Sequence, residues 1–278
     1  RIIVQRERLR QVFHPAIYYD LKAVFQSKDK DFSAKLVRVD KKRIAIGKDF
    51  DPNTGQLKNK DVLLLSKSQA EALVKELHKG VWTIHGVEEK IINSHPKPPF
   101  TTSTLQQEAA RKLRSSARKT MRTAQRLYEK GLITYMRTDS TVLSAEGING
   151  ARNEIKSRFG KEYLPDQARV YATKVKNAQE AHEAIRPAGV TFASVDAVRA
   201  AIDEDAAKLY DLIRKRTLAS QMESAKVKQI KVTIENQKSE FRANGKVILF
   251  PGYMAAYVES TDRRGGITED QETILPDL

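Results

Sequence analysis

Hydrophobic and polar positions alternate in different ways along the chain and predict three regions. Residues 16–48 and 223–258 favour strands, because β-branched and aromatic residues recur there between charged turns. Residues 101–220 instead favour helices that end in glycine or are preceded by Ser, Thr or Asp. Four helices are predicted, from Thr104 to about Leu113 with a Thr104/Gln107 capping box, and over Ser116–Lys130, Ser144–Phe159 and Asp203–Ser220.

Shorter signals complete this prediction. Ser66 to Lys79 has a helical apolar stripe, Val81 to Ile84 begins a strand, and Asn244-Gly245 is typical of a hairpin turn. The proline-rich stretch from Ser94 to Pro99 indicates a boundary. We therefore expect an α+β protein with a discontinuous β-rich domain, residues 1–98 and 223–278. A mostly helical domain, residues 99–222, would be inserted into it.

The charge points to a polyanionic partner. The 278 residues include 50 Lys and Arg against 35 Asp and Glu, a formal net charge of +15. Nucleic acid is the simplest such partner. No apolar run is long enough to span a bilayer, so we expect an intracellular protein without a membrane partner. Both ends of the chain suggest a piece of something longer.

A run of basic residues is the strongest candidate for a nucleic-acid contact. Four arginines recur every fourth residue, at positions Arg114, Arg118, Arg122 and Arg126. On one helix they would follow one another at intervals of about 6 Å, which is similar to the phosphate spacing of a single strand. Most charged runs are only solvated helix faces. Like charges four residues apart destabilise a helix unless an anion compensates, which favours phosphate contact for the group.

Two further clusters carry possible chemistry. Tyr135 and Arg137 share a face if Leu132 to Met136 forms a short strand, and a cation beside a phenol would assist nucleophilic attack on phosphorus. His182 and Arg186 would present together if residues 179–186 are helical, and the pair could hold a phosphate. Read alone, each cluster is more often structural: a packed tyrosine, or a Glu–Arg pair at a helix end.

Several kinds of site are excluded by what the sequence lacks. There is no cysteine, which rules out disulfides, Cys–zinc sites and thiol nucleophiles. There is no Gly-rich phosphate loop followed by Lys and Ser or Thr, and no His-Glu-x-x-His motif. The acidic pairs also lack the third carboxylate of a magnesium motif, so we expect no metal to be bound by this chain.

At four stretches the sequence resembles the bacterial type IA DNA topoisomerases. These stretches are residues 99–107, 119–129, 131–140 and 179–187, and the weaker similarity of residues 1–98 and 223–278 extends the resemblance over essentially the whole chain. The resemblance implies that Tyr135 is the nucleophile that holds a 5′ phosphate and that Arg137 contacts the scissile phosphate. It also implies that His182 and Arg186 lie near the cleavage site as DNA-binding residues. The family often has Gly where Arg114 stands.

The resemblance implies an ATP-independent enzyme of the bacterial cytoplasm, acting at the nucleoid, that nicks one DNA strand, passes another through the gap and reseals it, relaxing negative supercoils. Its Mg²⁺ would be held by a Toprim domain that this chain lacks. By this resemblance the chain is the central arch of the enzyme, in which the discontinuous β-rich domain is a hinge domain and the inserted helical domain carries Tyr135. We expect a monomeric fragment that binds single-stranded DNA weakly and is inactive in relaxation by itself.

Two alternatives stay open. The chain could be a non-catalytic module that binds single-stranded nucleic acid, with Tyr135 merely packed. It could also be another tyrosine transesterase that leaves a 3′ phosphotyrosine, although His182 and Arg186 are one residue too far apart for the motif of those enzymes.

Overall fold

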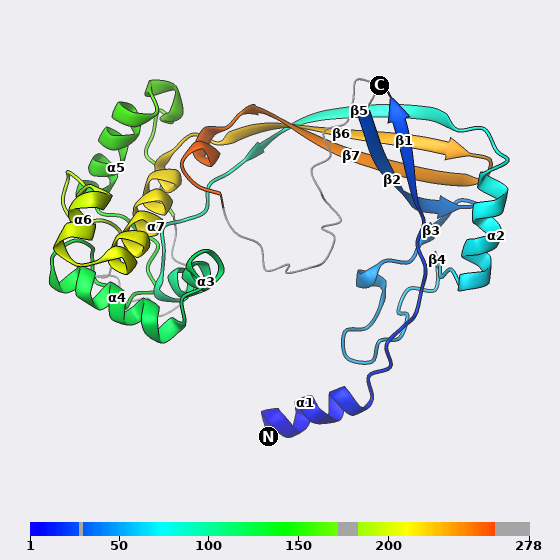
Figure 1. Ribbon diagram of the computed structural model, residues 1–278, viewed down its shortest axis with the longest axis horizontal. Helices are drawn as coiled ribbons and strands as arrows, with labels where there is room; N and C mark the ends of the chain where they lie inside the picture. Colours follow the sequence, from blue (N-terminus) through cyan, green and yellow to red (C-terminus); the bar gives the residue numbers. More distant parts are fainter. Residues whose placement is uncertain (28–29, 172–182, 259–278) are drawn as a thin grey trace. The chain divides into compact units, whose positions relative to one another are not determined.

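The computed structural model describes residues 1–27, 30–171 and 183–258, which fold as a mixed α+β protein (Figure 1). The described chain forms two compact units. The first contains Arg1–Ile91 and Lys228–Val247, and the second contains Ile92–Val227 together with residues 248–258. The mixed class predicted from the sequence is confirmed. The domain limits at residues 98 and 222 stay predictions, because the long strands include residues of both units.

A seven-stranded sheet contains all the strands of the described chain. Its strands are β1 (Lys22–Ser27), β2 (Lys30–Val39), β3 (Lys42–Ile44), β4 (Val62–Leu63), β5 (Thr83–Ser94), β6 (Ala225–Asn236) and β7 (Ser239–Phe250). The order is β4-β3-β2-β7-β6-β5, and β1 pairs with β2. Strands from the two ends of the sequence thus meet where β2 pairs with β7, with Leu36 opposite Phe241.

An aromatic cluster forms the core of the first unit. Trp82 packs edge-on against Phe25 and Phe241, with ring centroids 4.9 and 5.0 Å away. Phe32, Ala34 and Leu36 alternate into the same core from β2. The predicted helix is present as α2 (Lys67–Leu77), because Ser66 caps it and exchanges hydrogen bonds with Gln69.

The hairpin predicted at Asn244-Gly245 is wrong. β7 runs through both residues, and the turn lies at residues 237–238, where Gln237 has φ +54°. Phe241, Ala243 and Gly245 are buried, and Arg242, Asn244 and Lys246 are more exposed, which is the period of a continuous strand. The Asn-Gly pair therefore continues one face pattern, and the chain reverses where β6 ends.

The second unit is mainly helical. Its helices are α3 (Thr102–Leu113), α4 (Ala117–Glu129), α5 (Ala145–Arg158), α6 (Val195–Ala201) and α7 (Glu204–Gln221). α7 contributes twelve buried residues, and the core gathers Leu105, Leu127, Tyr210 and Ile213 from three of the helices. Figure 1 shows α3 to α7 packed into one bundle. This bundle positions the segments that carry the candidate site.

Helix caps decide the limits of these helices. Ser116, Ser144 and Asp203, where three of the predicted helices begin, are the N-caps, and each accepts a backbone N–H of the first turn. α3 starts earlier than expected, because Thr101 is its N-cap and Thr104 is the third helical residue. Among the described residues two α-helices were missed. They are α6 and α1 (Ile2–Gln11); α1 has no apolar stripe at helical spacing and buries no residue.

Candidate active site around Tyr135

Tyr135 lies on an irregular segment between α4 and α5. The strand predicted for Leu132 to Met136 is wrong, because only an isolated bridge from Ile133 to Pro187 forms there. The segment is flanked by residues 100–101 and the start of α3 on one side and by irregular residues 184–188 on the other. Neither neighbour is a strand, so no continuous ladder can form. Individual hydrogen bonds hold the segment in place.

Anchors on both sides fix the backbone next to Tyr135. Thr134 N–H donates to the Arg186 carbonyl at 2.9 Å, and Arg186 N–H donates back to Thr134 Oγ1 at 3.0 Å. On the other side, the Thr102 hydroxyl at the start of α3 donates to the Met136 carbonyl at 2.7 Å. Thr138 N–H donates to Thr102 Oγ1 at 2.9 Å. Tyr135 therefore stands between two fixed residues.

Side chains of the segment alternate between solvent and core. Met136 is buried, with 1% exposed, whereas Tyr135 is 41% exposed and Arg137 is exposed. The Tyr135 ring packs at 65° against Tyr128 of α4, with centroids 5.3 Å apart. Tyr128 was not singled out from the sequence. The sequence signal that could have placed Tyr128 next to Tyr135 is Gly131, whose φ of +66° turns the chain back along the end of α4.

The four arginines do not form one stripe. Arg114 is not on α4: it ends α3 in the left-handed conformation, with φ +52° and ψ +33°. Arg118, Arg122 and Arg126 are on α4 and exposed, but a four-residue repeat drifts by about 40° per step around a helix of 3.6 residues per turn. The arginines therefore reach different flanks of α4.

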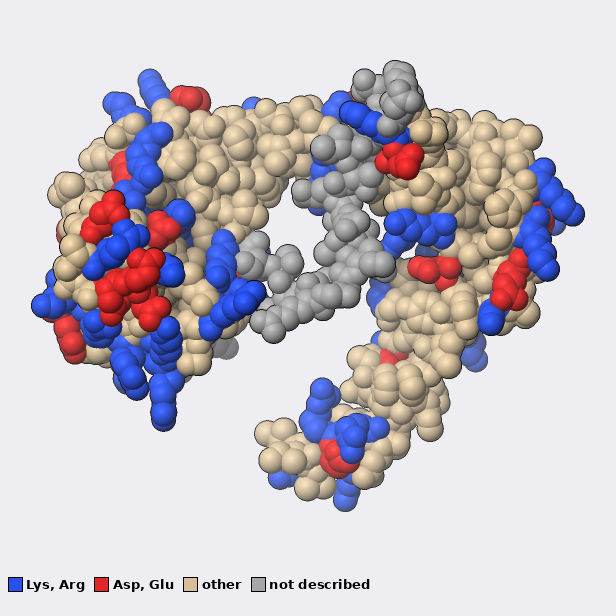
Figure 2. Space-filling model, in the orientation of Figure 1, with Lys and Arg blue, Asp and Glu red and all other residues tan. Residues whose placement is uncertain are grey.

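One flank of α4 is neutralised by α7. Arg126 pairs with Asp203 at 2.6 Å and Lys119 pairs with Asp205 at 2.7 Å. Figure 2 shows basic and acidic side chains side by side on this part of the surface, the basic ones along α4 and the acidic ones near α6. Within the described ranges Arg118 and Arg122 have no acidic partner. They lie between the Arg126 flank and the Tyr128 flank, which are about 160° apart.

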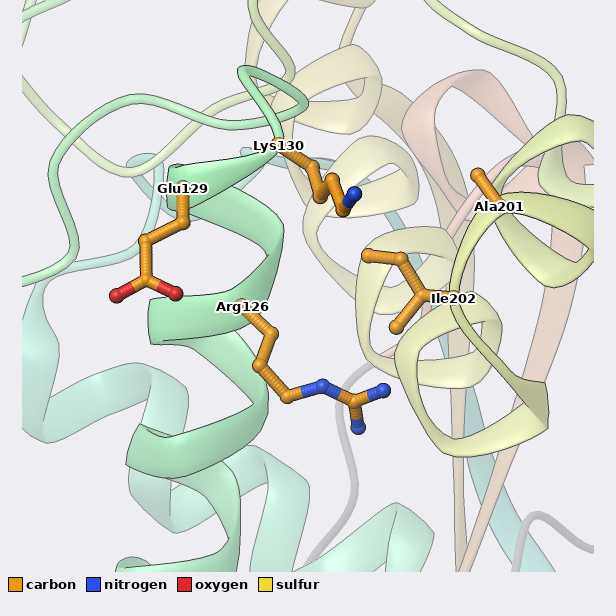
Figure 3. A pocket seen from close by; sticks show the side chains of 5 residues that line it. All are labelled: Arg126, Glu129, Lys130, Ala201 and Ile202. Carbon is orange, nitrogen blue, oxygen red and sulfur yellow. The ribbon is translucent and has the colours of Figure 1, made fainter.

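A small surface hollow marks the neutralised flank. Arg126 and Lys130 at the end of α4 line it together with Ala201 and Ile202 at the end of α6 (Figure 3). The Arg126 guanidinium points toward the α6 side of the hollow, and the Glu129 carboxylate points away. The hollow lies on the Arg126 flank of α4, so it is no part of the surroundings of Tyr135.

Arg186 is buried, with 4% exposed. Residues 183–187 are not helical and Ile185 N–H donates to the Phe100 carbonyl, so the helix predicted over residues 179–186 is wrong for its described part. His182 lies outside the described residues. Burial raises the pKa of Glu183, but hydrogen bonds from Arg186 and Ser144 outweigh it and hold that pKa below its usual value. Arg186 and Glu183 thus form an inward ion pair, at 2.6 Å.

The described residues contain neither a metal-binding cluster nor a membrane-spanning helix. No three acidic or histidine side chains within residues 1–27, 30–171 and 183–258 are grouped to hold a metal ion. No helix among the same residues is long and apolar enough to cross a membrane.

Comparisons with known proteins identify the family of the chain. A family model described as DNA topoisomerase matches residues 1–278. The chain is 50% identical to DNA topoisomerase 1 of Synechocystis sp. and 49% identical to that of Mycolicibacterium smegmatis, in each case over 100% of this chain. It spans 31% of each of those proteins, or about a third of their length.

The fold matches a solved enzyme as well. Full-length topoisomerase I from Thermotoga maritima is similar with a TM-score of 0.68 and 30% identity, over 98% of this chain and 40% of that one. The four motifs, the mixed fold and these matches lead to one conclusion. The chain belongs to the DNA topoisomerase family, among the bacterial type IA enzymes.

Proposed function

We propose that this chain carries the strand-cleaving tyrosine of a type IA topoisomerase. The Tyr135 hydroxyl attacks a DNA phosphodiester, the phosphotyrosyl bond forms to the 5′ phosphate, and the bond from phosphorus to the 3′ oxygen breaks. The proton lost by the phenol is balanced by the proton that the 3′ oxygen takes up as it leaves as a hydroxyl. Attack by the 3′ hydroxyl reverses the reaction after strand passage. The ester conserves the energy of the broken bond, so neither step needs ATP. The exposed Tyr135 on its doubly anchored segment carries the proposal.

Arg137 supplies positive charge in this proposal. Its exposed side chain lies two residues from Tyr135, with buried Met136 between them. A guanidinium near the scissile phosphate would stabilise the charge that develops on the phosphoryl oxygens. Arg118 and Arg122 would contact phosphates along one strand, joined by Arg114 from the end of α3.

The metal is proposed to lie outside this chain. Type IA enzymes are generally Mg²⁺-dependent through a Toprim domain, and the relatives of this chain have about two thirds of their length outside the match. Glu183, whose partner Arg186 bonds to the tyrosine segment, is already paired with that arginine. We therefore expect the isolated chain to bind single-stranded DNA as a monomer and not to relax plasmids.

A covalent adduct tests the role of Tyr135. The assay uses a hybrid enzyme, in which this chain replaces the matching third of Synechocystis DNA topoisomerase 1. We expect Tyr135→Phe to abolish the denaturant-resistant DNA adduct. Tyr128→Phe, which changes a neighbouring tyrosine that is also 41% exposed, should retain it. An adduct that survives Tyr135→Phe would refute the assignment.

The second candidate is a non-catalytic module that binds single-stranded nucleic acid. The packing of Tyr135 on Tyr128 favours it, because a packed ring needs no chemistry. This candidate predicts DNA binding without any adduct in the hybrid enzyme. A tyrosine linked to a 3′ phosphate would instead indicate another class of transesterase.

A further inference from the structure

We propose that Arg186 is a positioning residue that fixes Tyr135 through Thr134, and that it does not contact DNA; this rests on the proposed role of Tyr135. Its sequence context suggested a phosphate contact. The structure gives its side chain inward partners and gives its backbone direct bonds to the tyrosine segment.

The guanidinium is fully used by the protein. Its Nε donates to Glu183 Oε1 at 2.6 Å and its Nη2 to Glu183 Oε2 at 3.2 Å. Nη2 also donates to Ser144 Oγ at 3.1 Å, and Nη1 donates to the carbonyls of Pro187 at 2.7 Å and Gly189 at 3.3 Å. Only 5% of the side chain is exposed. A phosphate could not approach without displacing these acceptors.

The same residue holds the tyrosine segment. Its backbone N–H and C=O both bond to Thr134, the residue before Tyr135. Thr134 Oγ1 in turn donates to the Ala184 carbonyl at 2.7 Å. Because the side chain is clamped at five acceptors, the backbone of Arg186 is a fixed reference for Thr134. A shift of Arg186 would therefore move the Tyr135 hydroxyl.

The first turn of α5 closes over the guanidinium. Ser144 N–H donates to Glu183 Oε1 at 2.7 Å, and a Cβ added at Gly147 would lie 2.5 Å from Cδ and from Nε of Arg186. The Arg186 side chain thus leaves no room for a side chain at position 147. This close approach offers a second way to disturb Arg186 without changing it.

Salt dependence separates positioning from contact. Binding of fluorescent dT12 to the 278-residue chain is measured against salt concentration. The plot of log K against log salt concentration has a negative slope, and loss of one phosphate contact reduces the magnitude of this slope by about 0.7 on single strands. We expect that loss for Arg122→Ala, whereas Arg186→Lys and Gly147→Ala should keep the wild-type slope. A slope lowered by Arg186→Lys to the same degree as by Arg122→Ala would overturn the proposal.

The cleavage rate measures the positioning. In the hybrid enzyme, Arg186→Lys should slow single-turnover cleavage by about 100-fold, because a misplacement of about 1 Å costs that much, while DNA affinity stays unchanged. Lys cannot reproduce the five-donor planar group. Gly147→Ala should slow cleavage too, and the two changes together should cost less than the product of their separate effects, because they disturb one contact.

Other outcomes remain separable. If Arg186→Lys fails to fold, Glu183→Gln tests the same clamp and should slow cleavage with an unchanged salt slope. Wild-type cleavage by whichever of these variants folds would overturn the inference. An adduct that survives Tyr135→Phe would instead overturn the proposed function, so the two failures are distinguishable.

Discussion

At the scale of single residues, Arg114 combines an unfavourable backbone with an exposed charge. Its φ of +52° is a conformation that glycine adopts without steric cost, and glycine is the usual residue where a helix ends in this way. A basic residue at this turn therefore costs backbone strain that glycine would avoid.

We expect Arg114→Gly to stabilise the chain by about 1 kcal/mol, because relief of the left-handed strain exceeds the entropy gained by the unfolded chain. Urea unfolding measures the difference. Arg114→Ala is the matched control, since it removes the same charge and keeps Cβ. An equal gain from both variants would show that charge, and not backbone strain, is responsible.

Asp49 gives the first unit a sensitivity to acid. Hydrogen bonds from Arg43, at 2.6 and 2.8 Å, and from the Ile46 N–H lower the pKa of Asp49 from 3.8 to about 2. A carboxylate with a lowered folded pKa stabilises the protein above its unfolded pKa and loses this contribution as the pH falls.

We expect the stability difference between wild type and Asp49→Asn to be constant above about pH 5 and to shrink as the pH falls from 3.8 to about 2. Urea midpoints measured by Trp82 fluorescence across this range provide the test. A pH-independent difference for Asp49→Asn would contradict the assignment.

At the scale of elements, Asp203 serves two helices. Its carboxylate accepts the Ala206 N–H at 2.8 Å as the N-cap of α7, and it pairs with Arg126 of α4. Loss of an N-cap costs about 1 kcal/mol, whereas exposed ion pairs contribute less.

We therefore expect Asp203→Ala to destabilise the chain by about 1 kcal/mol and Asp203→Asn, which keeps the cap, by a few tenths at most. Urea unfolding followed at 222 nm measures both. Equal losses would mean that the ion pair is the dominant contribution of Asp203.

Elements with a local signal were predictable from the sequence, and the candidate site was predictable only in part. Ser66, Ser116 and Ser144 mark the starts of helices in the sequence, because an N-cap hydrogen bond joins residues only three positions apart. The segment of Tyr135 was mistaken for a strand because its partners, Thr102 and Arg186, lie 33 and 51 positions away in the sequence. The inward ion pair of Arg186 likewise needs burial, which no local pattern reveals.

At the scale of the whole molecule, the two units have separate cores. Trp82, the only tryptophan of the chain, packs in the core of the first unit, and α3 to α7 belong to the second. Tryptophan fluorescence therefore reports mainly on the first unit, and the helical circular dichroism mainly on the second.

We expect Phe241→Ala to lower the free energy of unfolding of the first unit by about 3–5 kcal/mol, because Phe241 is buried. The urea midpoint followed by fluorescence should fall accordingly, and the midpoint followed by circular dichroism should change much less. Leu127→Ala, in the core of the second unit, should do the opposite. Coincident shifts of both signals would show that the units unfold together.

The anchoring of Tyr135 sets a minimum length for any segment that is grafted onto another protein together with this tyrosine. A peptide of residues 131–140 grafted onto another scaffold would leave Thr102 and Arg186 behind, and with them the bonds that orient its backbone. A minimal miniature of the site must therefore reach at least from residue 100 to residue 188, most of the helical unit. Protein engineers should treat that whole stretch as one part.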